Sequence, residues 1–195
     1  MDRARAAGID LRLVASTAIV TVLVLVTLVT ERSRPDAVAG YGVLDARGVA
    51  VATNVEGVEV GQPAPAFRLL DTDGQAVTLS DLTGAPVVLQ FWTTWCLDCI
   101  DAIPVFQQIS TSHVDDVVVL GIASNETGSR VEGALNRAGA TYTALLDSDG
   151  VVANRYGARS VPYTVVIDGN GMVAAVHEGR VSVAQLESDL AALQP

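Results

Sequence analysis

The sequence predicts an α/β fold with a central mixed β-sheet flanked by helices. From about residue 61 onward, strand patterns alternate with helical patterns, which is typical of parallel strands joined by crossover helices. The last two strand patterns are joined by a tight-turn sequence, which predicts an antiparallel hairpin and therefore a mixed sheet. A continuous apolar segment, without the alternation seen in these patterns, precedes this region.

That apolar segment, residues 13–30 (LVASTAIVTVLVLVTLVT), contains no charge and no proline. Eighteen residues at 1.5 Å per residue reach the lower limit for a bilayer span. We therefore expect a transmembrane anchor here, with residues 1–12 in the cytoplasm. Two alternatives stay open. A cleaved signal peptide is suggested by Ala37-Val38-Ala39, although the apolar run exceeds the usual length for one, and a buried core helix is the other.

Both membrane interpretations place the rest of the chain outside the cytoplasm, and the anchor makes it a single-pass protein of the cell membrane. Arginines flank the apolar segment on both sides, so the positive-inside rule favours a cytoplasmic N-terminus only weakly. The net charge is −10 at pH 7, and residues 61–195 hold six arginines against fifteen acidic residues. This charge excludes electrostatic binding to nucleic acid.

The elements follow in order. Residues 31–60, rich in small residues and valine, are expected to be a linker, and residues 61–195 a separate domain. Within that domain we expect short strands at 66–70 and 76–78, then a continuous apolar strand at 87–92 of the kind buried in a central sheet. A helix from Cys96 to about residue 112 carries apolar side chains at three-residue steps.

The second half continues with a buried strand at 116–124 and an amphipathic helix at 127–139. The stretch YTALLD leads to a short helix near 150–156. Two strands then flank the turn sequence Asp168-Gly169-Asn170-Gly171, a strong hairpin signal. A final helix covers 182–193 with Ser182 as its N-cap.

The chain has two cysteines, Cys96 and Cys99, and both lie at the expected helix start. Residues three apart on a helix share a face. Cys96 lies in the first turn, where free N–H groups and the helix dipole favour an anion and so lower the pKa of a thiol. Cys99 lies one turn deeper. We therefore expect Cys96 to attack the disulfide of a partner and Cys99 to resolve the mixed disulfide.

Two other uses of the pair stay open. A structural disulfide would close so short a loop that it stabilises by only roughly 2 kcal/mol. A zinc site would need four ligands. The remaining candidates, His113 and His177, lie on separate elements without metal spacing, and each is expected to be an ordinary surface residue. We expect no metal and no cofactor beyond the redox-active Cys96–Cys99 disulfide.

A strand, the motif Trp-Cys-x-x-Cys, and Pro104 five residues after the second cysteine together resemble the thioredoxin superfamily. The lead-in VGQPAPAFRLLDTDG and the stretch LSDLTGAPVVLQFWTTWC resemble its membrane-anchored TlpA/ResA-like branch, also grouped with the redoxins. The resemblance covers about 61–194. It implies a thioredoxin fold with the TlpA-type strand–helix insert at about 117–138, an N-terminal transmembrane helix, and thiol–disulfide oxidoreductase activity.

The resemblance also assigns a substrate groove. It implies a cis peptide bond at Val161-Pro162 facing the cysteines, which leaves the Val161 backbone free to pair with an extended substrate. A trans proline at a strand start is the alternative. The resemblance implies that Trp95 packs beside the nucleophile, and ordinary core packing is its alternative.

The chain departs from the family pattern at three positions. Asp98 stands where proline is frequent, and its carboxylate disfavours a nearby thiolate, which makes the pair more reducing. Gln90 replaces the buried aspartate of plain thioredoxin. Ala102, with Asp101 beside it, replaces a glutamate of some ResA-like reductases.

We therefore expect an extracytoplasmic reductase of protein disulfides, for example in cytochrome c maturation, that receives electrons from a membrane donor. A redoxin-type peroxidase is one alternative, because Thr93 lies three residues before Cys96. However, Leu89 stands where the peroxidatic motif has proline, and peroxide-dependent turnover would discriminate. A non-enzymatic binding module with an inert bridge is the other alternative, and it predicts no exchange with any disulfide.

Overall fold

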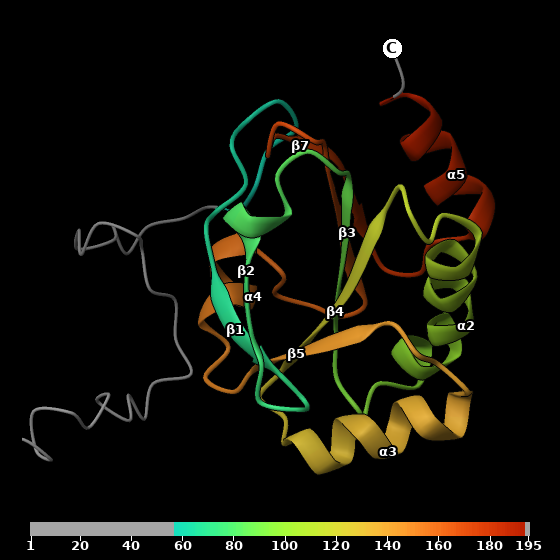
Figure 1. Cartoon of the computed structure of the whole chain (residues 1–195). Helices are drawn as coiled ribbons and strands as arrows, with labels where there is room; N and C mark the ends of the chain where they lie inside the picture. Colours follow the sequence, from blue (N-terminus) through green and yellow to red (C-terminus); the bar gives the residue numbers. More distant parts are fainter. Residues whose placement is uncertain (1–56, 194–195) are drawn as a thin grey trace, which may run out of the picture. The chain divides into compact units, whose positions relative to one another are not determined.

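The computed structural model describes residues 57–193 (Figure 1). The segment 13–30, for which the sequence predicts an anchor, and all but the end of the expected linker lie outside this range. Within 57–193, none of the helices combines the length and the apolar character needed to cross a membrane. Residues 57–60 already contact the domain, since Val58 packs against its buried cluster.

Seven strands form one mixed sheet in the order β2-β1-β5-β4-β3-β6-β7. β3, β4 and β5 run parallel, and the remaining pairs are antiparallel. The strands are β1 (Arg68–Asp71), β2 (Ala76–Thr78), β3 (Val87–Trp92), β4 (Val118–Ser124), β5 (Thr143–Asp147), β6 (Tyr163–Ile167) and β7 (Val173–Glu178). The helices are a 3-10 helix (Leu79–Leu82), α2 (Leu97–Ser112), α3 (Gly128–Ala138), α4 (Val151–Tyr156) and α5 (Val183–Ala191). This confirms the predicted thioredoxin fold.

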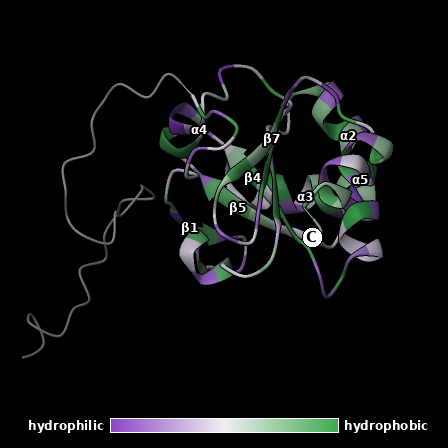
Figure 2. Ribbon diagram, turned by 90° about the horizontal axis from the view of Figure 1, so that it is seen from above, coloured by the Kyte–Doolittle hydropathy of each residue, from purple (hydrophilic) through white to green (hydrophobic). Residues whose placement is uncertain are grey.

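The sheet separates two apolar clusters. α2, α3 and α5 cover one face, and α4 with the 3-10 helix covers the other (Figure 1). In Figure 2, β4 and β5 are mainly hydrophobic, whereas the helices carry hydrophobic and hydrophilic residues. The first cluster includes both cysteines, so the redox pair is part of the core on the α2 side. The strand–helix insert of β4 and α3 is present as expected.

The closing hairpin forms as predicted. Gly171 donates its N–H to the Asp168 carbonyl at 2.9 Å, and the Asp168 side chain accepts from the N–H groups of Asn170 and Met172. Ser182 caps α5 by accepting from the N–H of Gln185 at 3.3 Å.

One strand is missing from the prediction. The sequence predicts that YTALLD leads into a helix, but residues 143–147 form β5, which pairs with β4 and β1. The stretch has no alternation of apolar and polar residues, since it is largely buried on both faces. Its pairing depends on neighbours that are far away in sequence, which a local pattern does not reveal.

Gly121 in β4 lies against two buried aromatic rings, and this close packing can be tested. A Cβ at this position would lie 2.9 Å from Trp92 Nε1 and 3.0 Å from Tyr142 Cε2, and both rings are buried. Because neither ring has space to withdraw, we expect Gly121→Ala to destabilise the domain by about 1–3 kcal/mol. A lower urea midpoint with an unchanged m-value would show this, and an unchanged midpoint would contradict the packing argument.

Candidate active site

Cys96 is the N-cap residue of α2, and Cys99 lies within its first turn. The two residues form a disulfide, with their Cα atoms 5.2 Å apart. Cys96 is 9% exposed and Cys99 is fully buried. Of the two sulfur-bearing residues, Cys96 is therefore the one that a partner protein can reach.

The backbone around Cys96 is arranged to hold negative charge. The N–H of Cys99 points at Cys96 Sγ at 3.1 Å, and the N–H of Ile100 donates to the Cys96 carbonyl at 3.1 Å. In the reduced protein, the first of these N–H groups and the helix dipole would both stabilise a thiolate at Cys96.

The Val161-Pro162 peptide bond is cis, as the family resemblance implied. The Val161 carbonyl oxygen lies 3.7 Å from Cys96 Sγ, which places this segment directly against the nucleophile. Trp95 is 73% exposed and Leu97 is 82% exposed, so the core-packing alternative for Trp95 is excluded. Cys96 thus lies between two exposed apolar side chains and faces the backbone of Val161.

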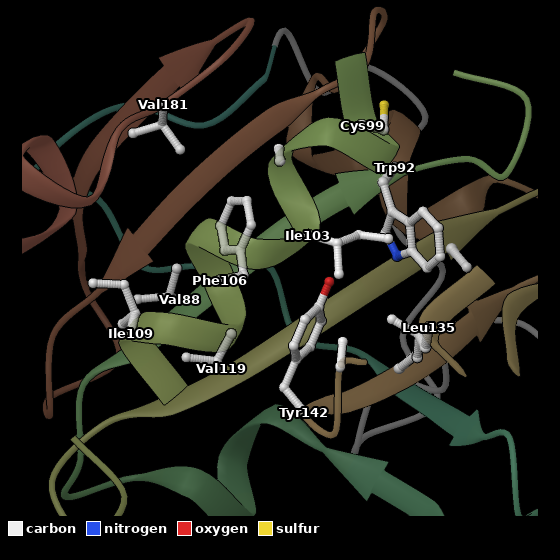
Figure 3. Packing of buried hydrophobic residues seen from close by; sticks show 14 of the residues in the cluster. Val88, Trp92, Cys99, Ile103, Phe106, Ile109, Val119, Leu135, Tyr142 and Val181 are labelled. Atoms are coloured by element: carbon white, nitrogen blue, oxygen red, sulfur yellow. The ribbon is translucent and has the colours of Figure 1, made fainter. Parts of the chain in front are cut away.

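The interior next to Cys99 is apolar and carries no carboxylate at the position of the thioredoxin aspartate. Trp92 and Ile103 lie beside Cys99, and the Tyr142 hydroxyl is directed toward them (Figure 3). That hydroxyl donates to Gln90 Oε1 at 2.8 Å. Burial raises the pKa of Tyr142 above its ordinary value, and the protonated hydroxyl remains the donor of this hydrogen bond.

The structure adds a buried carboxylate that sequence reasoning missed. Glu126 is 5% exposed, and its Oε1 accepts from the Thr94 N–H at 2.7 Å and from the Thr94 hydroxyl at 2.6 Å. Thr94 belongs to a turn closed by the Cys96 N–H and the Thr93 carbonyl at 3.4 Å. Asn125, with φ of 56°, turns the chain just before Glu126. Glu126 therefore holds the turn that presents the nucleophile.

A second missed residue is Arg180. Its Nη1 lies 3.2 Å from Asp98 Oδ1 and 3.4 Å from Asp101 Oδ2. The sequence predicts only that the Asp98 carboxylate disfavours a nearby thiolate, whereas the structure gives this carboxylate a cationic partner 82 residues away in sequence.

Both histidines are partly exposed at the surface, but each makes an ion pair that the sequence does not predict. Their side chains are 24% and 23% exposed, and each pairs with a carboxylate of α5: His113 with Glu187 at 2.9 Å and His177 with Asp189 at 2.6 Å. α5 packs against α2, and its Leu186 and Leu190 belong to the same buried cluster as the apolar side chains of α2. No group of three or more potential metal ligands occurs among residues 57–193.

Comparison with known proteins agrees with this geometry. A sequence profile of the AhpC/TSA family matches residues 60–176. The chain is 31% identical to thiol-disulfide oxidoreductase ResA of Geobacillus thermodenitrificans, over 73% of this chain and 83% of the relative. It is 29% identical to ResA of Bacillus subtilis, over 75% of this chain and 82% of the relative.

Among solved structures, a putative thiol:disulfide interchange protein DsbE from Chlorobium tepidum has a TM-score of 0.64 and 30% identity, covering 70% of this chain and 98% of that one. The structure of MTB DsbF, in mixed oxidised and reduced forms, has a TM-score of 0.61 and 32% identity, covering 66% and 95%.

Proposed function

Because the chain belongs to the AhpC/TSA family and, within the thioredoxin superfamily, to the ResA-like thiol–disulfide oxidoreductases, we propose that it reduces protein disulfides outside the cytoplasm while tethered to the membrane. One observation carries this proposal: an accessible sulfur at a helix N-terminus is bonded to a buried sulfur one turn away. The reduced Cys96–Cys99 pair itself supplies the two electrons that reduce a substrate disulfide.

The reaction proceeds by two exchanges. The Cys96 thiolate attacks one sulfur of the substrate disulfide, forming a mixed disulfide and releasing the other substrate sulfur as a thiolate, which takes up a proton. Cys99, once deprotonated, attacks Cys96 Sγ and releases the second substrate thiol. The substrate gains two electrons and two protons, and the enzyme ends with the Cys96–Cys99 disulfide.

The surroundings of Cys96 suit an extended, partly apolar protein segment. Trp95 and Leu97 offer exposed apolar surface, and the Val161 backbone lies beside the sulfur. Cysteine pairs of apocytochrome c before haem attachment are the substrate that the ResA-like resemblance favours. After each cycle the enzyme holds the Cys96–Cys99 disulfide, which needs two electrons from another molecule. A membrane donor of electrons would return the enzyme to its dithiol form.

The reducing direction is testable by the reduction potential. The carboxylate of Asp98 in the first turn of α2, with Asp101 one turn further on, disfavours the thiolate, and strong oxidants owe their potential to a stabilised thiolate. We expect the purified full-length protein to equilibrate with glutathione at a potential below about −180 mV, the value typical of protein disulfide isomerase. A potential near about −120 mV, as in DsbA, would make it an oxidant instead.

The location is testable by protease accessibility. If residues 13–30 anchor the chain with its domain outside, protease added to intact spheroplasts should digest the domain, and the undigested protein should sediment with membranes. Full protection would contradict the proposed location. A soluble form beginning at Gly40 would instead support the signal-peptide alternative.

A further inference from the structure

Arg180 lies on the same wall of the active site as the cis proline. It follows Gly179, whose N–H donates to the Pro162 carbonyl at 2.8 Å. The neighbouring Val161 carbonyl is the group 3.7 Å from Cys96 Sγ. The short loop between β7 and α5 is therefore fixed against the segment that faces the nucleophile.

From this loop, Arg180 reaches across to the first turn of α2. One guanidinium nitrogen contacts carboxylates of Asp98 at 3.2 Å and Asp101 at 3.4 Å. Residues three apart on a helix share a face, which is why one cation reaches both. Asp98 lies between the two cysteines in the sequence, so this charge cluster is next to the redox pair. Glu126, which holds Thr94, is the carboxylate that approaches the active-site turn from the β4–α3 loop.

We propose that Arg180 is a positioning residue that sets the stability of the Cys96 thiolate, and so the reduction potential, by compensating Asp98 and Asp101. With Arg180 in place, the cluster carries one net negative charge rather than two. This proposal rests on the thiol–disulfide exchange of the pair, and it does not depend on the proposed substrate or location.

The signs of the expected effects separate this electrostatic role from a merely structural one. Arg180→Gln leaves both carboxylates uncompensated, which destabilises the thiolate and shifts the equilibrium with glutathione toward the oxidised protein. Asp98→Asn leaves the cation facing one carboxylate, which stabilises the thiolate and shifts the equilibrium toward the dithiol. A bridge that only braces the loop against α2 would be weakened by Asp98→Asn and lost in Arg180→Gln, and both variants would then shift in the same direction.

The effect is expected to be modest and sensitive to salt. All three side chains are more than half exposed: Arg180 is 56% exposed, and Asp98 and Asp101 are each 63% exposed. Water and ions therefore screen the charges, and we expect each equilibrium constant to change about two- to fivefold at low ionic strength. At about 1 M salt, where the Debye length falls to about 3 Å, most of the change should disappear.

The test compares the full-length protein in detergent with Arg180→Gln, Asp98→Asn and a control, Arg130→Gln. Arg130 is an exposed arginine in the first turn of α3, so its substitution removes the same charge away from the cluster. For each protein, the glutathione equilibrium and the thiolate absorbance of Cys96 are measured against pH at low and high salt, and the urea midpoint confirms folding.

Opposite shifts for the two variants, no shift for the control, and collapse of the shifts in high salt would support the proposal. Shifts in one direction, or an unchanged equilibrium in Arg180→Gln, would overturn it while leaving the oxidoreductase assignment intact. Failure of the unmodified protein to exchange with glutathione at all would overturn both.

Discussion

Cys99→Ser is expected to accumulate as covalent complexes with substrate proteins, whereas Cys96→Ser is expected to form none. Cys96 is the exposed partner of the pair, and the Cys99 side chain is fully buried beside Trp92. Without Cys99, the mixed disulfide at Cys96 has no internal thiol to break it, so the reaction stops halfway. Without Cys96, a partner disulfide cannot reach the remaining sulfur. Turnover should fall to the uncatalysed rate in both variants.

Non-reducing gels of both full-length variants, expressed in cells, measure this asymmetry. Complexes on Cys99→Ser should dissolve under dithiothreitol, and the Cys96→Ser/Cys99→Ser double variant is the matched control. Complexes on Cys96→Ser alone would reverse the two roles. If neither variant forms complexes and the unmodified protein also fails to reduce insulin, the structural-bridge interpretation is the correct one.

Glu126→Ala is expected to have the second largest effect, because it removes the buried acceptor of both hydrogen bonds from Thr94. Hydrogen bonds to a charged group contribute about 1.5–3 kcal/mol each, and part of this is offset because the carboxylate no longer has to be desolvated. We expect a loss of about 2–4 kcal/mol in unfolding free energy, together with slower attack by Cys96 as the turn loosens. Glu126→Gln keeps an acceptor oxygen, so its loss in unfolding free energy should be less than half of the loss in Glu126→Ala.

Urea unfolding and the rate of insulin reduction test this prediction on the same samples. The matched comparison is Glu132→Ala, since Glu132 is an exposed carboxylate on α3. If Glu126→Ala unfolds at the same midpoint as the control and reduces insulin at the same rate, Glu126 does not hold the active-site turn.

Local patterns in the sequence predicted most of the fold. The apolar run of β3, the three-residue apolar steps of α2 and the turn sequence before β7 each mark one element by a pattern that is visible within a few residues. β5 was not predicted, because its five residues do not alternate between apolar and polar and owe their conformation to pairing with two flanking strands. The ion pairs of the histidines were not predicted for a related reason, since both of their partners lie on α5.

The same distinction holds for the active site. The cysteine pair and its order of burial follow from the start of one helix, so the sequence predicted them. The partners of Gln90 and Asp98 lie 52 and 82 residues away, and Glu126 lies 32 residues from Thr94. No local spacing indicates such contacts. The sequence therefore predicts a carboxylate beside the cysteine pair at Asp98, but only the structure shows its contact with Arg180.

The central claim is that Cys96–Cys99 is a redox-active pair that passes two electrons to a protein disulfide. The most direct measurement mixes the reduced full-length protein with insulin, quenches with an alkylating reagent, and determines the mass of both proteins over time. The account predicts that the enzyme loses two alkylatable thiols for each insulin disulfide reduced, with no requirement for peroxide. Thiols that stay reduced beside intact insulin would contradict it.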